Sequence, residues 1–106
     1  MSVGGCMKIL HLTLKKQWFD LIASGLKDEE YRELKQYWHA RLQNKHYDAI
    51  EFRNGYQKNA PTMTVELKII TIGLGNPSWG APETEEVYIL KLGKILEVRN
   101  GCACND

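Results

Sequence analysis

The segment Gly25-Leu26-Lys27-Asp28-Glu29-Glu30-Tyr31-Arg32 holds the residues of this 106-residue chain that are best suited to chemistry. Its last six residues comprise two cations, three carboxylates and one tyrosine. Side chains alternate along an extended strand, so Glu30 and Arg32 are expected on one face and Glu29 and Tyr31 on the other. So polar a segment between two stretches rich in Trp, Phe and Leu predicts a charged, ordered wall of a groove.

Four positions of this segment have chemical roles that complement one another. Arg32 offers a planar fork of donors to a phosphate or a base edge. Glu30 can accept a hydrogen bond from an exocyclic amine or serve as a general base. Lys27 can meet a phosphate, stabilise an oxyanion or act as a base, and Gly25 permits the turn that precedes it. The alternative is a structural Glu30–Arg32 ion pair on an exposed edge strand.

Two loops add candidate ligand-binding residues. The sequence Arg53-Asn54-Gly55-Tyr56 puts a cation, an amide and an aromatic at a reversal, which would suit phosphate contact and base stacking. The alternative is that Asn54-Gly55 only builds a hairpin. Trp79 stands in a long Gly- and Pro-rich loop, where it either covers a cleft or anchors the loop to the core.

Neither the cysteines nor the histidines are spaced as a metal site requires. Cys102 and Cys104 offer two thiols with no adjacent histidine, whereas a structural zinc usually needs four ligands. The histidines stand too far apart to share an ion: His11, His39 and His46. We predict no metal and no cofactor, and the odd cysteine count favours a reducing, cytoplasmic location.

Composition describes an ordinary globular protein, with 43% hydrophobic and 25% charged residues. The length predicts a single domain over residues 1–106, with disordered tails at 1–5 and 101–106. Residues 1–60 carry ten Lys/Arg against seven Asp/Glu, so a local basic face is compatible with the overall charge of +1. No apolar run approaches the length of a membrane-spanning helix, so we expect no membrane partner. For the oligomeric state we favour a monomer.

Periodicity predicts a mixture of strands and helices. Alternation indicates strands at residues 8–14, 47–53 and 62–72, and the last of these changes phase, as a bulge or bend would require. Helical spacing indicates helices at residues 15–24 and 34–45, with Trp18 and Trp38 on their core-facing stripes. His39 and His46 are expected at the surface.

The end of the chain is predicted to contain a Gly- and Pro-rich loop at residues 73–86, then two strands, 87–92 and 94–99, separated by Gly93. Strands that mostly follow one another favour an α+β fold. We therefore expect a small curved sheet or barrel of about five or six strands, with two short helices flanking its openings.

In its order of elements, and in the pattern Gly25-x-Lys27-x-x-Glu30-x-Arg32 between helix and strand, the chain resembles the ASCH domain family. The resemblance covers roughly residues 9 to 99 and implies a PUA-like β-barrel whose cleft binds RNA or a nucleotide. Some members of the family are small amidohydrolases that act on acetylated cytidine. In those, the motif lysine works with a hydroxyl residue three positions later, where this chain has Glu30, and with a downstream glutamate. By order alone, the candidates for that glutamate are Glu66, Glu83, Glu85 and Glu86.

Three functions therefore stand as hypotheses. The favoured one is an RNA- or nucleotide-binding module that uses Gly25, Lys27, Glu30, Arg32, Arg53, Asn54, Tyr56 and Trp79. The second is an amidohydrolase of an acylated nucleoside, with Lys27 and Glu30 as the chemical pair. The third is a protein-interaction domain. Near-neutral total charge favours a pocket for one or two nucleotides over tight non-specific RNA binding.

Overall fold

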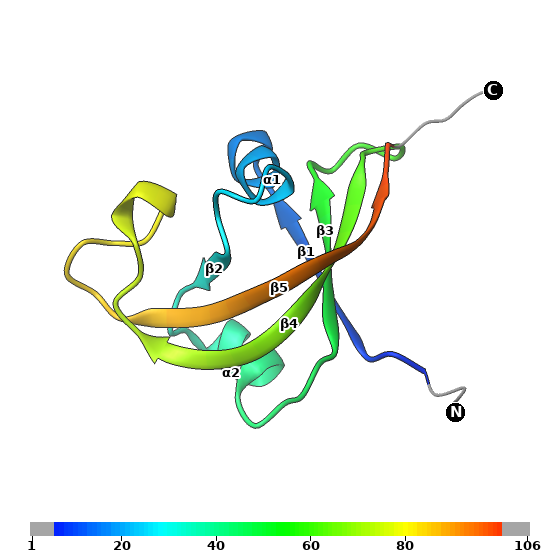
Figure 1. The fold of residues 1–106 in the computed structure, drawn as a ribbon. Coiled ribbons are helices and arrows are strands. Elements are labelled where there is room, and N and C mark those ends of the chain that lie inside the picture. Colours follow the sequence, from blue (N-terminus) through cyan, green and yellow to red (C-terminus); the bar gives the residue numbers. More distant parts are fainter. Residues whose placement is uncertain (1–5, 101–106) are drawn as a thin grey trace.

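The chain forms an α+β fold in which five strands make one curled sheet, a half-barrel that carries two short helices (Figure 1). The computed structural model describes residues 6–100, so the predicted tails and the Cys102–Cys104 pair lie outside the described residues. The strands are β1 (Ile9–Leu14), β2 (Glu29–Arg32), β3 (Ala49–Asn54), β4 (Thr62–Gly73) and β5 (Val87–Arg99). The helices are α1 (Lys16–Ala23), α2 (Gln36–Leu42) and a 3₁₀ turn, η1 (Pro77–Trp79).

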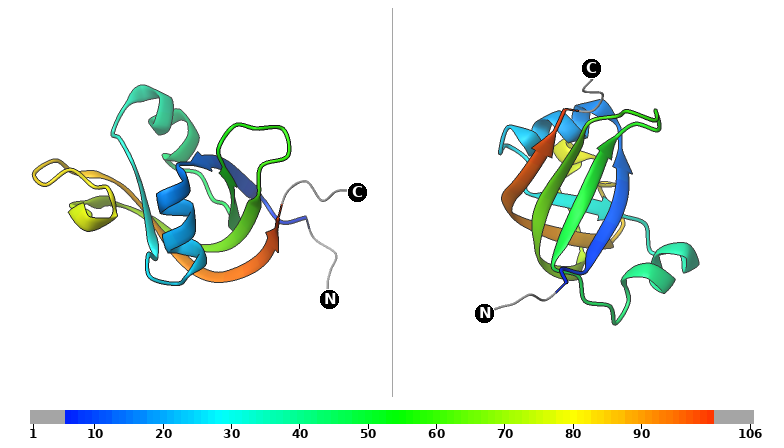
Figure 2. Two further views of the ribbon diagram at one scale, coloured as in Figure 1. Left: turned by 90° about the horizontal axis from the view of Figure 1, so that it is seen from above. Right: turned by 90° about the vertical axis from the view of Figure 1, so that its right-hand side faces the viewer.

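The sheet has the order β1-β3-β4-β5-β2, so the first two strands of the chain are its two edges. β1 runs parallel to β3, and the other neighbours are antiparallel. The long strands β4 and β5 bend strongly, and α1 lies over the concave side that this curvature creates (Figure 2). The curl brings the two edge strands towards each other without a β1–β2 ladder between them.

The predicted change of phase in β4 is confirmed. Its pairing with β5 shifts register between Thr64 and Val65, between Val65 and Leu67, and between Leu67 and Ile69. The predicted break at Gly93 is wrong, because β5 runs unbroken from Val87 to Arg99. Glu66 explains this glycine: a Cβ at position 93 would collide with the Glu66 carboxylate, so Gly93 provides space for a neighbouring side chain.

Helix α1 ends as its sequence predicts. Gly25 adopts a φ of 84°, and its N–H and that of Leu26 donate to the carbonyls of Ile22 and Leu21. This is the Schellman arrangement, in which a glycine in the left-handed region closes the last turn. Phe19 and Ile22 point from α1 into the core, so the helix packs on the sheet while its end sends the chain into β2.

The core lies between α1 and the concave side of the sheet, and two predictions about it need correction. Trp18 and Trp38 pack against the core but are only half-buried, so they lie at its margin. His39 is half-buried and not a surface residue, because its Nδ1 shares a 2.6 Å hydrogen bond with the hydroxyl of Tyr88. In residues 6–100, no helix is long and apolar enough to cross a membrane.

Candidate binding cleft

The alternation predicted for β2 determines the chemistry of its two faces. Glu30 and Arg32 share one face, where Glu30 Oε2 lies 2.8 Å from Arg32 Nη2. Glu29 and Tyr31 share the other, where the Tyr31 hydroxyl donates to Glu29 Oε1 at 2.7 Å. A four-residue strand thus supplies two separate polar networks, one on each face.

On the first face, Lys27, Glu30 and Arg32 form a continuous chain of charges. Lys27 Nζ donates to Glu30 Oε1 at 2.9 Å and also to the main-chain carbonyl of Glu29. The Lys27 side chain is 0% exposed, and that of Glu30 is 9% exposed. A fully enclosed ammonium group requires a paired carboxylate, because an unpaired buried charge costs several kcal/mol.

Aromatic rings complete the enclosure of Lys27. Its Nζ lies 5.7 Å from the centre of the Trp18 ring and 5.2 Å from that of Tyr31. At these distances the ring faces attract a cation, and more strongly where water is excluded. Lys27 is therefore held in place by these contacts and pairs with Glu30 from the enclosed side of that carboxylate.

Arg32 connects the two edges of the open sheet. Its Nη2 donates to the main-chain carbonyl of Thr13 in β1 at 3.3 Å, while its guanidinium carbon lies 5.0 Å from the centre of the Trp38 ring. Within residues 6–100, no group accepts a hydrogen bond from its Nε, which is buried. A buried donor without an acceptor costs about 1–3 kcal/mol, so this nitrogen favours a ligand or water that can accept from it.

A cleft of about 500 Å³ opens beside this arginine, between the end of β1, the start of α1, β2 and the loop after β3. Its lining comprises Thr13, Leu14, Lys15, Trp18, Glu30, Tyr31, Arg32, Gly55 and Tyr56. Tyr56 is 88% exposed, so its ring is available at the cleft. The volume lies within the range of small-molecule sites.

The structure brings together some of the residues predicted for the site. Glu30, Arg32 and Tyr56 line the cleft, and Lys27 contacts Glu30 from behind. Gly25 lies outside the cleft and acts as the stop of α1.

The remaining predicted ligand residues do not line the cleft. The Arg53 guanidinium donates to the carbonyls of Gln57 and Lys58, which fixes the loop that carries Tyr56. The Asn54 N–H donates to the carbonyl of Pro61 across the hairpin, at 2.9 Å. Trp79 belongs to η1, whose neighbour Gly80 lies against the ring of Trp18.

None of the four candidate downstream glutamates lines the cleft either. Glu66 accepts from the N–H of Lys94 at 3.2 Å, and the other three precede β5 and are exposed. Among residues 6–100, no group of three or more Asp, Glu, His or Cys side chains is arranged to hold a metal ion.

Sequence reasoning missed three contributors to the site. Thr13 supplies a carbonyl, which no side-chain pattern reveals. Trp38 was assigned to the core, and its contact with Arg32 depends on how α2 folds back toward β2. Lys15 was not singled out in the sequence, although it directly follows β1 and lines the cleft.

The second face of β2 holds the loop after β4 in place. The Asn76 N–H donates to the Tyr31 hydroxyl at 3.0 Å, and Lys91 Nζ donates to Glu29 Oε2 at 2.9 Å. Burial and the bond to Glu29 raise the pKa of Tyr31. Burial alone would raise the pKa of Glu29, but hydrogen bonds from Tyr31 and Lys91 outweigh it and lower that pKa below 4.5.

This network predicts part of the protein's acid sensitivity. A carboxyl whose pKa is lower in the folded state stabilises the fold above its unfolded pKa, near 4.5, and that contribution disappears as the pH falls through the folded value. Urea unfolding between pH 7 and pH 3 should therefore show a shallower acid-side loss of stability for Glu29→Gln than for the unmodified protein. Glu85→Gln, which changes an exposed carboxylate, should leave the slope unaltered. Parallel curves for the protein and Glu29→Gln would contradict this assignment.

Comparison of the chain with protein-family models, with curated proteins and with solved structures finds no match.

Proposed function

We propose that the cleft between the edge strands binds a nucleotide, either free or as part of single-stranded RNA. The observation that carries the proposal is that Arg32 has hydrogen-bond donors without acceptors. Of its guanidinium nitrogens, only Nη2 has acceptors among residues 6–100, and the buried Nε has none. An anionic oxygen on the nucleotide would accept from these unused donors, as phosphates and carboxylates do from arginine forks.

The charges around the cleft support an anionic ligand. Among residues 6–100, the lining of the cleft holds two cations, Lys15 and Arg32, against one carboxylate, Glu30, which Lys27 contacts from behind. Both oxygens of Glu30 already contact a cation, so this carboxylate positions Lys27 and Arg32 and does not repel a phosphate by itself. The excess of positive charge would raise the local concentration of anions.

The position of Tyr56 favours a ligand that contains an aromatic base. Its largely exposed ring lies on the same cleft as Arg32, and stacking on a base would bury it. Stacking tolerates any base, whereas the polar edge of the cleft selects for the phosphate. The order of elements and the Gly-x-Lys-x-x-Glu-x-Arg pattern also support membership of the ASCH domain family, for which nucleotide binding is expected.

One contact favours a second candidate function, hydrolysis of an acylated nucleoside. Lys27 and Glu30 touch at 2.9 Å, and Glu30 reaches the cleft, so the predicted chemical pair is assembled. In this arrangement only Glu30 would meet substrate or water, while Lys27 would act through it. Binding has more support than hydrolysis, because Glu30 is the one carboxylate that residues 6–100 contribute to the lining of the cleft.

The test is an NMR titration of ¹⁵N-labelled protein with CMP, cytidine and N4-acetylcytidine, in which ligand signals are followed in the same tube. We expect CMP to shift the amides of β2 and of the Gly55–Tyr56 turn. Arg32→Lys keeps the charge but loses the fork, so CMP should bind roughly tenfold more weakly, which corresponds to about 1.4 kcal/mol. Arg99→Lys, the same change at an exposed arginine on β5, should leave affinity unchanged.

The outcomes separate the candidates. Saturation by CMP without conversion of any ligand supports the binding module. Conversion of N4-acetylcytidine would favour the hydrolase over the binding module, provided that Glu30→Gln abolishes the conversion and this variant is folded. Equal CMP affinity for Arg32→Lys and the unmodified protein would overturn the assignment of Arg32.

A further inference from the structure

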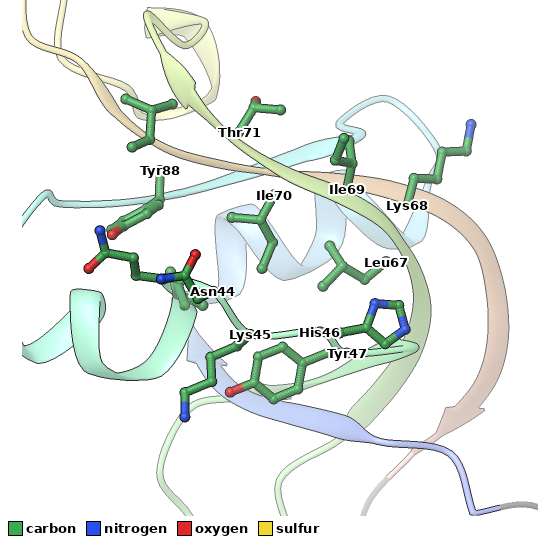
Figure 3. A pocket seen from close by; sticks show the side chains of 13 residues that line it. Asn44, Lys45, His46, Tyr47, Leu67, Lys68, Ile69, Ile70, Thr71 and Tyr88 are labelled. Carbon is green, nitrogen blue, oxygen red and sulfur yellow. The ribbon is translucent and has the colours of Figure 1, made fainter.

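A second cavity of about 510 Å³ lies beside the C-terminal half of β4 (Figure 3). One wall is the strand itself, from Leu67 to Ile72, and the opposite wall is the α2–β3 loop, from Gln43 to Tyr47. Tyr88 closes one end. The candidate cleft and this cavity share no lining residue.

The β4 wall of this cavity is a free sheet edge. β3 pairs with β4 only from Thr62 to Glu66, and the last main-chain bond on that side joins the N–H of Leu67 to the carbonyl of Asp48. From there on, β4 continues through Gly73 and pairs with β5 alone. Within residues 6–100, no strand pairs with this segment on the side away from β5, so alternate N–H and C=O groups between Lys68 and Ile72 have no strand partner where the cavity lies.

The same segment exposes apolar side chains on both of its faces. Ile69 and Ile72 have opposite parity, and each is 55% exposed, while Ile70 lies partly buried between them against the core. A long, apolar, unpaired edge is a template for pairing with another chain, and soluble proteins usually blunt such edges. Here the α2–β3 loop stands beside the edge but leaves the cavity open.

The charges at the cavity decide what kind of chain fits. Its lining includes Lys45 and Lys68 and, among residues 6–100, no Asp or Glu, while His46 in the lining lies 3.3 Å from Asp48 Oδ1. Neither lysine has an ion-pair partner among residues 6–100. A second copy of this edge would bring two sets of lysines together, which disfavours self-pairing. An acidic segment would be attracted.

We propose that the free edge of β4 binds an extended peptide segment of a partner protein by strand addition, and that this segment alternates apolar and acidic residues. Main-chain hydrogen bonds from Lys68–Gly73 would supply affinity. The apolar side chains of the segment would cover Ile69 or Ile72, and its carboxylates would meet Lys45 and Lys68. This combination of a main-chain ladder with side-chain pockets is the known mode of peptide recognition at sheet edges.

The experiment uses the synthetic peptide acetyl-Glu-Ile-Asp-Val-Glu-Ile-Asp-amide as probe, titrated into the ¹⁵N-labelled full chain at about 0.1 M salt. We expect the amide signals of residues 67–73 to shift and their hydrogen exchange to slow on alternate residues. The same peptide with proline in place of valine cannot complete the ladder and should bind at least tenfold more weakly. A peptide with lysine at every acidic position should bind weakly as well.

Charge reversal supplies the matched variants. Lys45→Glu with Lys68→Glu should weaken the acidic peptide at least tenfold and restore binding of the lysine peptide. Lys58→Glu, at an exposed lysine outside the cavity, should change neither. Amide signals elsewhere in the spectrum report whether the double variant keeps its fold.

Three results would overturn the proposal. The first is an absence of shifts at millimolar acidic peptide. The second is equal binding of the proline peptide, which would exclude a main-chain ladder. The third is binding of another occupant at residues 67–73. Concentration-dependent dimerisation through these residues would assign the edge to a second copy of the chain, and displacement of the peptide by single-stranded RNA would assign it to RNA. None of these results depends on whether CMP binds the candidate cleft.

Discussion

Replacing Lys27 with methionine is expected to lower the free energy of unfolding by about 3 kcal/mol. The Lys27 side chain is fully enclosed, and its ammonium group holds Glu30 Oε1 at 2.9 Å. Methionine fills a similar volume but leaves the Glu30 oxygen without its partner. Removal of one member of a buried pair typically costs about 3–5 kcal/mol, and the remaining contact with Arg32 places this variant at the lower end.

Urea unfolding, followed by circular dichroism, measures this effect, and two further variants define its cause. Lys16→Met removes an exposed i,i+4 pair with Asp20 and should cost less than about 0.5 kcal/mol. Lys27→Met combined with Glu30→Gln removes the uncompensated charge and should recover part of the loss. If the double variant is as unstable as the sum of the single ones, the two side chains do not act as a pair.

The local structure of the site could be predicted from the sequence because it depends on neighbours along the chain. Alternation places Glu30 and Arg32 on one face of β2, and the structure has them there. The stop at Gly25 follows from its position at the end of a helical pattern. The phase change in β4 could also be read from the order of its apolar residues, because a register shift reverses which parity faces the core.

The cleft itself could not be predicted, because it depends on contacts between distant parts of the chain. The sheet order places β1 and β2 at opposite edges, and only the curl of the sheet brings Thr13 within reach of Arg32. The prediction that Arg53 contacts a ligand stays untested, but its guanidinium is already engaged by the loop carbonyls of Gln57 and Lys58. Gly93 was misread as a break because the neighbouring Glu66 lies on another strand.

The loop after β4 is expected to be sensitive to a single added methyl group at Gly75. A Cβ at this position would lie 2.6 Å from Tyr31 Cε1 and 2.7 Å from Ala81 Cβ, far inside van der Waals contact. The Tyr31 ring cannot easily move, because its hydroxyl is bonded to both Glu29 and the N–H of Asn76. Gly75→Ala should therefore lower the free energy of unfolding by about 2–3 kcal/mol, as overpacking does.

Gly73→Ala is the matched control, two residues away on the same segment. A Cβ there would meet only Ile89 Cδ1, at an ordinary contact distance of 3.6 Å. The change should alter stability by less than about 0.5 kcal/mol, since a methyl group that fits also reduces the freedom of the unfolded chain. Urea unfolding of the two variants under one set of conditions makes the comparison direct.

The cause of the Gly75 effect can be separated from a general intolerance of the loop. In a Tyr31→Ala background the ring is absent, so the part of the Gly75→Ala penalty that comes from the ring should disappear, while the contact with Ala81 Cβ remains. An undiminished penalty would show that the Tyr31 ring is not the obstacle. Because Tyr31 stands between Glu30 and Arg32 in β2 and lines the cleft, displacement of its ring should also weaken CMP binding in the single variant. Gly75 would then be required for the geometry of the cleft, although its own atoms do not line the cleft.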